Sequence, residues 1–122
     1  MNFFEKREHP VVDSQKIIEG LTDWINLRLS EPLTIDKIAL RSGYTKWHLQ
    51  RMFRRVKGTT LIAYIRNQRL EKAYAELLQT ADSLSTVAQR NGFNSPESFS
   101  RAFTQRFILT PTEFRRIHNS AD

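Results

Sequence analysis

The sequence contains no cysteine, which excludes a disulfide framework and thiolate chemistry. It has no apolar run close to the ~18 residues that a membrane-spanning helix needs. Its charged N-terminus has no apolar signal core. We therefore expect a cytoplasmic protein that does not associate with a membrane.

Residues typical of enzyme sites are also scarce. The three histidines, His9, His48 and His118, lie far apart in the sequence. Neither a HExxH motif nor a glycine-rich phosphate loop is present. An enzyme is therefore the disfavoured class, and we expect no metal site and no cofactor.

Positive charge is abundant, and it is unevenly distributed. The chain has 122 residues, of which 39% are hydrophobic, enough for a core in one domain or two small ones. Its net charge is +6. The segment 41–72 holds nine Lys/Arg and one acid, whereas the remainder holds ten Lys/Arg and twelve acids. Such a basic segment attracts a polyanion such as DNA, although a solvated charged surface is the alternative reading.

Apolar periodicity and capping residues predict an all-α fold with seven helices and no strand. The expected helices run over about 15–29 after Ser14, from Thr34 to 42, over 46–56 after Thr45, from Thr59 or Thr60 to 79, from Ser83 to 91, from Ser95 to 107, and over 111–118 after Thr110. Gly43, Gly58 and Gly92 are expected to supply the turns that follow three of these helices.

An internal repeat divides the chain into two similar halves. The matching residues are Ala39, Arg41 and Gly43 with Ala88, Arg90 and Gly92, then Arg51 and Phe53 with Arg101 and Phe103. Each copy is a short helix, a glycine turn and a longer helix. That order is typical of a helix-turn-helix, whose second helix enters the DNA major groove.

The repeat predicts two helix-turn-helix subdomains joined by a long linker helix. The expected divisions are an N-terminal tail (1–12), a first subdomain (13–58), the linker helix (59–79), a second subdomain (80–118) and a C-terminal tail (119–122). A linker of about 20 residues is ~30 Å long, close to the ~34 Å of one DNA turn. One chain could therefore read two successive major grooves of an asymmetric site.

The first recognition helix has a polar face that suits DNA. Arg51 can donate two hydrogen bonds to guanine, and Gln50 can pair with adenine. Trp47 can contact thymine methyl groups or sugars, or it can be a core aromatic. Leu49 and Phe53 lie on the opposite, apolar face.

On the second recognition helix, Arg101 is the best candidate for reading a base. Glu97 either accepts a hydrogen bond from cytosine or favours the helix dipole as an N-terminal charge. The predicted base contacts are Trp47, Gln50, Arg51, Glu97, Ser98 and Arg101. The predicted phosphate contacts are Arg41, Thr45, Lys46, Arg54, Arg55, Lys57, Arg90, Ser95, Thr104 and Gln105.

The run from Ser42 to Phe53 resembles the first recognition unit of the AraC/XylS family of transcriptional activators, especially the small single-domain branch of MarA, SoxS and Rob. The resemblance continues through 64–70, 92–107 and Thr110-Pro111, and covers about residues 14–117. It implies a monomeric, bipartite activator that recruits RNA polymerase at bacterial stress and drug-resistance promoters. It also implies that Trp47, Gln50 and Arg51 contact the first half-site and Arg101 the second.

The chain departs from that branch at Pro96-Glu97, where a Gln-Gln pair is usual. We therefore hypothesise that affinity depends mainly on the first recognition helix. Two helix-turn-helix units occupy the chain, so we expect no small-molecule effector. A repressor or architectural protein with the same fold is the alternative function, and a protein-interaction module is a further one.

Overall fold

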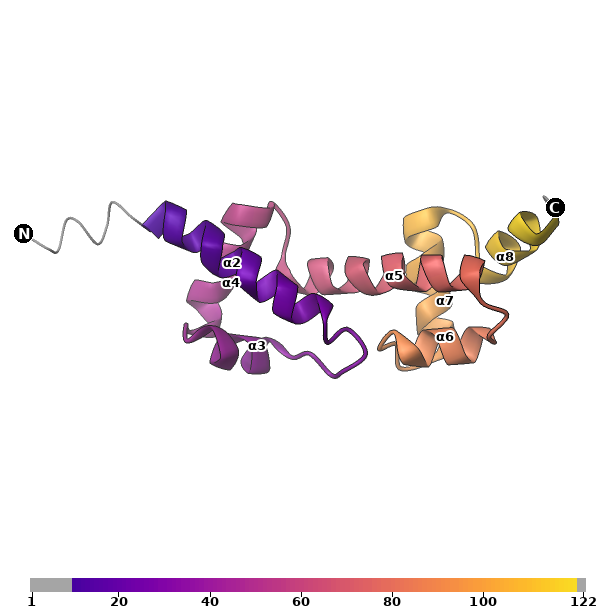
Figure 1. Cartoon of the computed structure of the whole chain (residues 1–122), viewed down its shortest axis with the longest axis horizontal. Coiled ribbons are helices and arrows are strands. Elements are labelled where there is room, and N and C mark those ends of the chain that lie inside the picture. The colour runs from indigo at the N-terminus through magenta and orange to yellow at the C-terminus, as the bar shows by residue number, and fades with distance from the viewer. Residues whose placement is uncertain (1–9, 121–122) are drawn as a thin grey trace, which may run out of the picture. The chain divides into compact units, whose positions relative to one another are not determined.

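The computed structural model describes residues 10–120, which form seven helices and no strand (Figure 1). The helices are α2 (Pro10–Asn26), α3 (Ile35–Ser42), α4 (Lys46–Lys57), α5 (Leu61–Gln79), α6 (Leu84–Arg90), α7 (Pro96–Phe107) and α8 (Pro111–Ser120). The all-α prediction is confirmed. Most of the predicted N-terminal tail, and residues 121–122, lie outside the described residues. No helix in the described range is long and apolar enough to cross a membrane.

Most helices begin where the capping residues predicted. The hydroxyls of Thr34, Thr45, Ser83 and Ser95 each accept a hydrogen bond from the backbone N–H three residues later. At α8, Thr110 and Glu113 exchange two such bonds at 3.0 and 3.1 Å. The pKa of Glu113 is lowered because the Thr110 backbone N–H donates to its carboxylate. These bonds satisfy N–H groups that have no partner within the helix.

The first described helix differs from its prediction. It begins at Pro10 rather than after Ser14, and it ends at Asn26 rather than near residue 29. Proline suits a helix start because its ring fixes φ near the helical value and the first turn needs no N–H. Ser14 is therefore not a cap, and it is buried within the helix.

The described chain forms two compact units. Unit 1 contains residues up to 28 and 33–65, and unit 2 contains 29–32 and 66 onward. Helix α5 contributes its beginning to unit 1 and the rest to unit 2. Each unit holds one helix-turn-helix, formed by α3 and α4 in unit 1 and by α6 and α7 in unit 2.

The core of unit 1 holds α4 by its apolar face. Leu49, Met52 and Phe53 of α4 are buried. The Phe53 ring meets Tyr64 of α5 edge-on at 5.3 Å between centroids. From α2, α3 and α5 the buried hydrophobic residues are Ile18, Leu21, Ile25, Ile38, Ala39, Leu61 and Ile65. Since the apolar face of α4 is buried in this way, the opposite, polar face is exposed to solvent.

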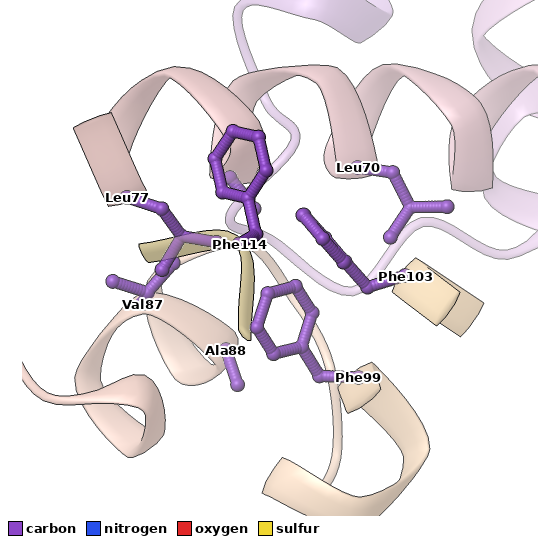
Figure 2. Close-up of a cluster of buried hydrophobic side chains, with 8 residues drawn as sticks. Leu70, Leu77, Val87, Ala88, Phe99, Phe103 and Phe114 are labelled. Carbon is purple, nitrogen blue, oxygen red and sulfur yellow. The ribbon is translucent and has the colours of Figure 1, made fainter. Parts of the chain in front are cut away.

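The core of unit 2 is built around aromatic side chains (Figure 2). Phe103 of α7 lies 5.7 Å from Phe99 and 5.5 Å from Phe114 of α8, measured between ring centroids. The cluster consists of Leu70, Ala73, Leu77, Val87, Ala88, Phe99, Phe103 and Phe114. The core face of α5 follows 70, 73 and 77, and Leu78 lies beside that face and is 47% exposed.

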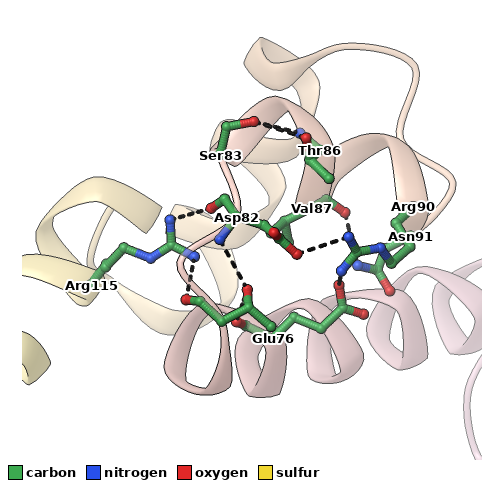
Figure 3. A network of polar contacts seen from close by, with 9 residues as sticks. Glu76, Asp82, Ser83, Thr86, Val87, Arg90, Asn91 and Arg115 are labelled. Carbon is green, nitrogen blue, oxygen red and sulfur yellow. Dashed lines mark hydrogen bonds and ion pairs between the residues drawn. The ribbon is translucent and has the colours of Figure 1, made fainter.

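Two arginines hold the connection between α5 and α6 (Figure 3). Arg115 donates hydrogen bonds to the backbone carbonyls of Leu77, Thr80 and Asp82, which have no partner within a helix. Arg90 of α6 donates to the carboxylates of Glu76 and Asp82, both at 2.8 Å. These contacts fix the start of α6 against the end of α5.

Helix α7 ends on a strained residue. Ile108 has φ +74° and is 80% exposed, whereas Gly58 has the same φ at the equivalent end of α4. A left-handed conformation costs a residue with a Cβ roughly 1–2 kcal/mol, and glycine loses about 0.5–1 kcal/mol more conformational entropy on folding. We therefore expect Ile108→Gly to raise the free energy of unfolding by about 0.5–1 kcal/mol in urea denaturation. The reverse change, Gly58→Ile, is the matched control and should destabilise the protein; a loss of stability in Ile108→Gly would contradict the prediction.

Candidate nucleic-acid interface

The outward face of α4 carries the residues that the sequence predicted to read bases. Trp47, Gln50 and Arg51 are all exposed, and Trp47 is 67% exposed. This excludes the alternative of a core aromatic for Trp47. The three side chains line a hollow of about 270 Å³ together with Arg54, Thr60 and Leu61. Aromatic, amide and guanidinium groups therefore gather on one face of a helix whose other face is buried.

Trp47 and Arg51 are in direct contact on that face. The guanidinium carbon of Arg51 lies 4.5 Å from the centroid of the Trp47 ring. The two residues are four apart, so they lie one above the other on the helix surface. A planar guanidinium over an indole ring is a cation–π arrangement.

The C-terminal turn of α4 is strongly basic. Arg54, Arg55 and Lys57 lie there and are exposed, and the first turn carries no acid. Within residues 10–120 none of the three forms an ion pair. Their charges interact favourably with the helix dipole and remain available to an external anion.

The other predicted phosphate contacts of unit 1 are exposed but already have neighbours. Lys46 pairs with Asp36 at 3.0 Å, and because both are exposed this pair is weak. Arg41 lies 5.6 Å above the ring of Trp24. The Thr45 hydroxyl accepts the His48 N–H as the cap of α4, which still leaves its own O–H free to donate.

At the start of α7, two serines form a capping box. Ser95 accepts the N–H of Ser98 at 3.1 Å, while the Ser98 hydroxyl accepts the Ser95 N–H at 3.3 Å and donates to the Ser95 carbonyl at 3.0 Å. Pro96 occupies the first helical position. Ser98, a predicted base contact, is thus half-buried, and its hydroxyl both donates and accepts within the capping box.

The exposed face of α7 carries Glu97, Arg101 and Gln105. Glu97 lies in the first turn, where a negative charge favours the helix dipole. The Thr104 hydroxyl is half-buried and donates to the Ser100 carbonyl at 2.7 Å. Glu97, Arg101 and Gln105 are thus the predicted contacts on α7 whose side chains are exposed to an external partner.

Arg90, a predicted phosphate contact, already has two acidic partners within unit 2. Its guanidinium is held by the carboxylates of Glu76 and Asp82. The hydrogen bond to Asp82, and to a smaller extent the one to Glu76, raises the pKa of Arg90. Its repeat counterpart Arg41 has no acidic partner within the described residues. The equivalent positions of the two arginines in the repeat therefore do not predict that only Arg90 forms ion pairs.

Sequence reasoning also missed the role of Arg69, which it counted only as part of the basic segment. Arg69 donates hydrogen bonds to the backbone carbonyls of Leu29 and Glu31, and burial lowers its pKa. Its partners lie about 40 residues away along the chain, so no local signal identifies it.

Comparison with known proteins agrees with this geometry. A helix-turn-helix domain family matches residues 38–117. The regulatory protein SoxS of Escherichia coli K12 is 46% identical over 101 residues, which is 83% of this chain and 94% of SoxS. The Right origin-binding protein of the same bacterium is 42% identical over 105 residues, which is 86% of this chain but 36% of that protein. The chain thus spans about a third of the length of this second relative.

Solved structures give the same result. A transcriptional regulator from Chromobacterium violaceum, described as containing an AraC-type DNA-binding domain, superposes with a TM-score of 0.80 at 30% identity. The match covers 88% of this chain and 96% of that one. SoxS and the Chromobacterium violaceum protein are both named as regulators, in agreement with the prediction that an enzyme is the disfavoured class. The chain belongs to the AraC-type family of helix-turn-helix DNA-binding transcription regulators.

Proposed function

We propose that this chain, as a monomer, reads an asymmetric DNA site with α4 and α7 in two major grooves and activates transcription by recruiting RNA polymerase. The observation that carries the proposal is the exposed face of α4, where Trp47, Gln50 and Arg51 lie beside a basic C-terminal turn. A guanidinium and an amide are the side-chain groups that form paired hydrogen bonds with guanine and adenine.

Reading of two grooves is supported by the repeated architecture. Each unit contains a short helix, a turn and a longer helix whose inner face is buried, and α5 runs through both units. A major groove admits one such helix, so two recognition helices require two groove segments. Because Trp47 and Gln50 are replaced by Glu97 and Ser100 in the repeat, the two half-sites should differ in sequence.

The first test is selection of bound sequences from random duplexes by the purified chain. We expect one asymmetric site whose two specified blocks lie about one helical turn apart. A symmetric site, or a single block, would contradict reading by two different helices. Native mass spectrometry of the chain on that duplex should show one protein per site.

Binding to the selected duplex should also weaken steeply with salt. Five basic side chains, Arg41, Lys46, Arg54, Arg55 and Lys57, are proposed to contact phosphates. Five such contacts predict a log–log slope of about −4.5, or a roughly 500-fold loss of affinity between 50 and 200 mM salt. Fluorescence anisotropy measures this slope, and salt-independent binding would instead favour a protein-interaction module.

Activation is tested separately from binding. A reporter carrying the selected site upstream of a weak promoter should respond to the chain when the site is moved by whole helical turns. Promoters of stress and drug-resistance genes, which the resemblance to SoxS and Rob suggests, are the natural targets. If the reporter is repressed at every position of the site, the proposed DNA binding stands, but the chain is a repressor and not an activator.

A further inference from the structure

The contact between Trp47 and Arg51 has a consequence for how α4 would read DNA. The guanidinium of Arg51 lies 4.5 Å from the Trp47 ring centroid, although both side chains face solvent. An exposed arginine normally samples many rotamers and loses that freedom when it binds. A guanidinium stacked on a ring keeps its N–H edge free, because the stack uses only its face.

Among the described residues, the Trp47 ring is the only group that holds Arg51. Within residues 10–120 no carboxylate pairs with Arg51, so no acid competes for its N–H groups. These are the groups that would donate in parallel to guanine O6 and N7. The arrangement therefore restrains the side chain while leaving its donors available.

The repeat provides an internal comparison. At the 50-residue offset, Arg101 corresponds to Arg51, and Glu97 corresponds to Trp47. In the described part of the chain, Arg101 has neither an aromatic ring over it nor an ion pair with Glu97. The two equivalent arginines thus differ in the residue one helical turn earlier. Of the two, only Arg51 lies over an aromatic ring.

We infer that Trp47 is a positioning residue, which holds the Arg51 guanidinium in a conformation ready for a guanine rather than reading a base itself. This inference rests on the proposed function of α4. The inference replaces the thymine contact that the sequence suggested for Trp47. It predicts that Trp47 affects discrimination at the base pair that Arg51 reads.

The test is a double-mutant cycle on the selected duplex with Trp47→Leu, Arg51→Ala and the double variant. Affinities are measured for that duplex and for duplexes changed one base pair at a time. We expect Trp47→Leu alone to weaken binding about 3- to 30-fold, as a cation–π contact of this strength predicts, and by less than twofold in the Arg51→Ala background. Discrimination should fall at the same base pair in both single variants, and Trp47→Phe should restore part of it.

A matched control uses the same chemistry away from α4. Arg28 lies 4.5 Å over the ring of Trp24 on α2, so Arg28→Ala removes a similar stack and one positive charge. It should leave discrimination at every base pair unchanged. Thermal unfolding of each variant shows whether the fold is retained, which the exposure of Trp47 leads us to expect.

The outcomes separate this inference from the proposed function. If Trp47→Leu costs the same with and without Arg51, or relaxes discrimination at a different base pair, then Trp47 reads DNA itself and the inference is wrong. If Arg51→Ala changes discrimination nowhere, the proposed role of α4 fails instead. In the free protein, the Arg51 Nε–H resonance should shift when Trp47 becomes leucine, and an unchanged resonance would likewise overturn the stack.

Discussion

Replacing Arg51 by alanine is expected to weaken binding to the selected DNA site about 5- to 150-fold and to abolish discrimination at one base pair. The cause is the loss of two parallel hydrogen bonds to a guanine, from a guanidinium that is exposed and already restrained by Trp47. The same change at Arg101 should cost less. Arg101 is not stacked within the described residues, and Glu97 lies one helical turn before it, where its charge opposes an approaching phosphate.

The measurement is the affinity of each variant for the selected site and for every single-base variant of that site. Arg51→Lys keeps the charge but not the fork of donors, so it should retain the salt dependence and lose the discrimination. Arg54→Ala is the matched control for charge alone, because it should weaken all duplexes alike and reduce the salt slope by about one. A larger loss in Arg101→Ala than in Arg51→Ala would show that unit 2, rather than unit 1, dominates recognition.

The part of this site that could be predicted is the part determined by local sequence. Alternation of buried and exposed positions on α4 follows from helical periodicity, so the sequence predicts Gln50 and Arg51 on the solvent face and favours it for Trp47, for which a core position was the alternative. The caps at Thr45 and Ser95 were predicted for a similar reason, because a capping hydroxyl acts only three residues along the chain.

What could not be predicted depends on contacts between distant segments. Arg90 and Arg41 occupy equivalent repeat positions, yet only Arg90 meets two carboxylates, because Glu76 and Asp82 are brought to it by the turn after α5. The sequence of the α7 start predicted a cap but not that Ser98 would complete it. In unit 2, three of the predicted phosphate contacts, Arg90, Ser95 and Thr104, therefore also form hydrogen bonds within the fold.

Replacing Gly92 by alanine should destabilise the protein more than the same change at any of the other three glycines. Gly92 has φ +81°, and an added Cβ would lie 2.7 Å from Arg69 Nε and 2.8 Å from the Leu29 carbonyl oxygen. Those two atoms are hydrogen-bonded to each other at 2.9 Å, and Arg69 also donates to the Glu31 carbonyl at 2.8 Å. The methyl group therefore displaces a half-buried guanidinium from two backbone carbonyls.

The expected cost is about 1–2 kcal/mol for the left-handed conformation and about 1.5–3 kcal/mol for each of the two charged hydrogen bonds lost, so roughly 4–8 kcal/mol in total. Gly43 offers a matched control, because it has the same φ at the equivalent turn of unit 1 and nothing lies within 4 Å of its added Cβ. Gly43→Ala should therefore cost only the about 1–2 kcal/mol of the left-handed conformation. Hydrogen exchange should be measured separately for amides in α6 and α7 and for amides in α3 and α4, so that each loss of stability is assigned to its unit. A single denaturation curve would not distinguish the two units.

A double-mutant cycle with Arg69→Ala then isolates the clash. Once the guanidinium is absent, Gly92→Ala should cost much less than it does in the wild-type chain, because only the backbone strain and the Leu29 carbonyl remain. Equal costs for Gly92→Ala and Gly43→Ala would contradict this account and would mean that the turn of unit 2 moves to accept the methyl group. In that case, Arg69 would not hold the segment 29–32 against this turn as firmly as its two hydrogen bonds indicate.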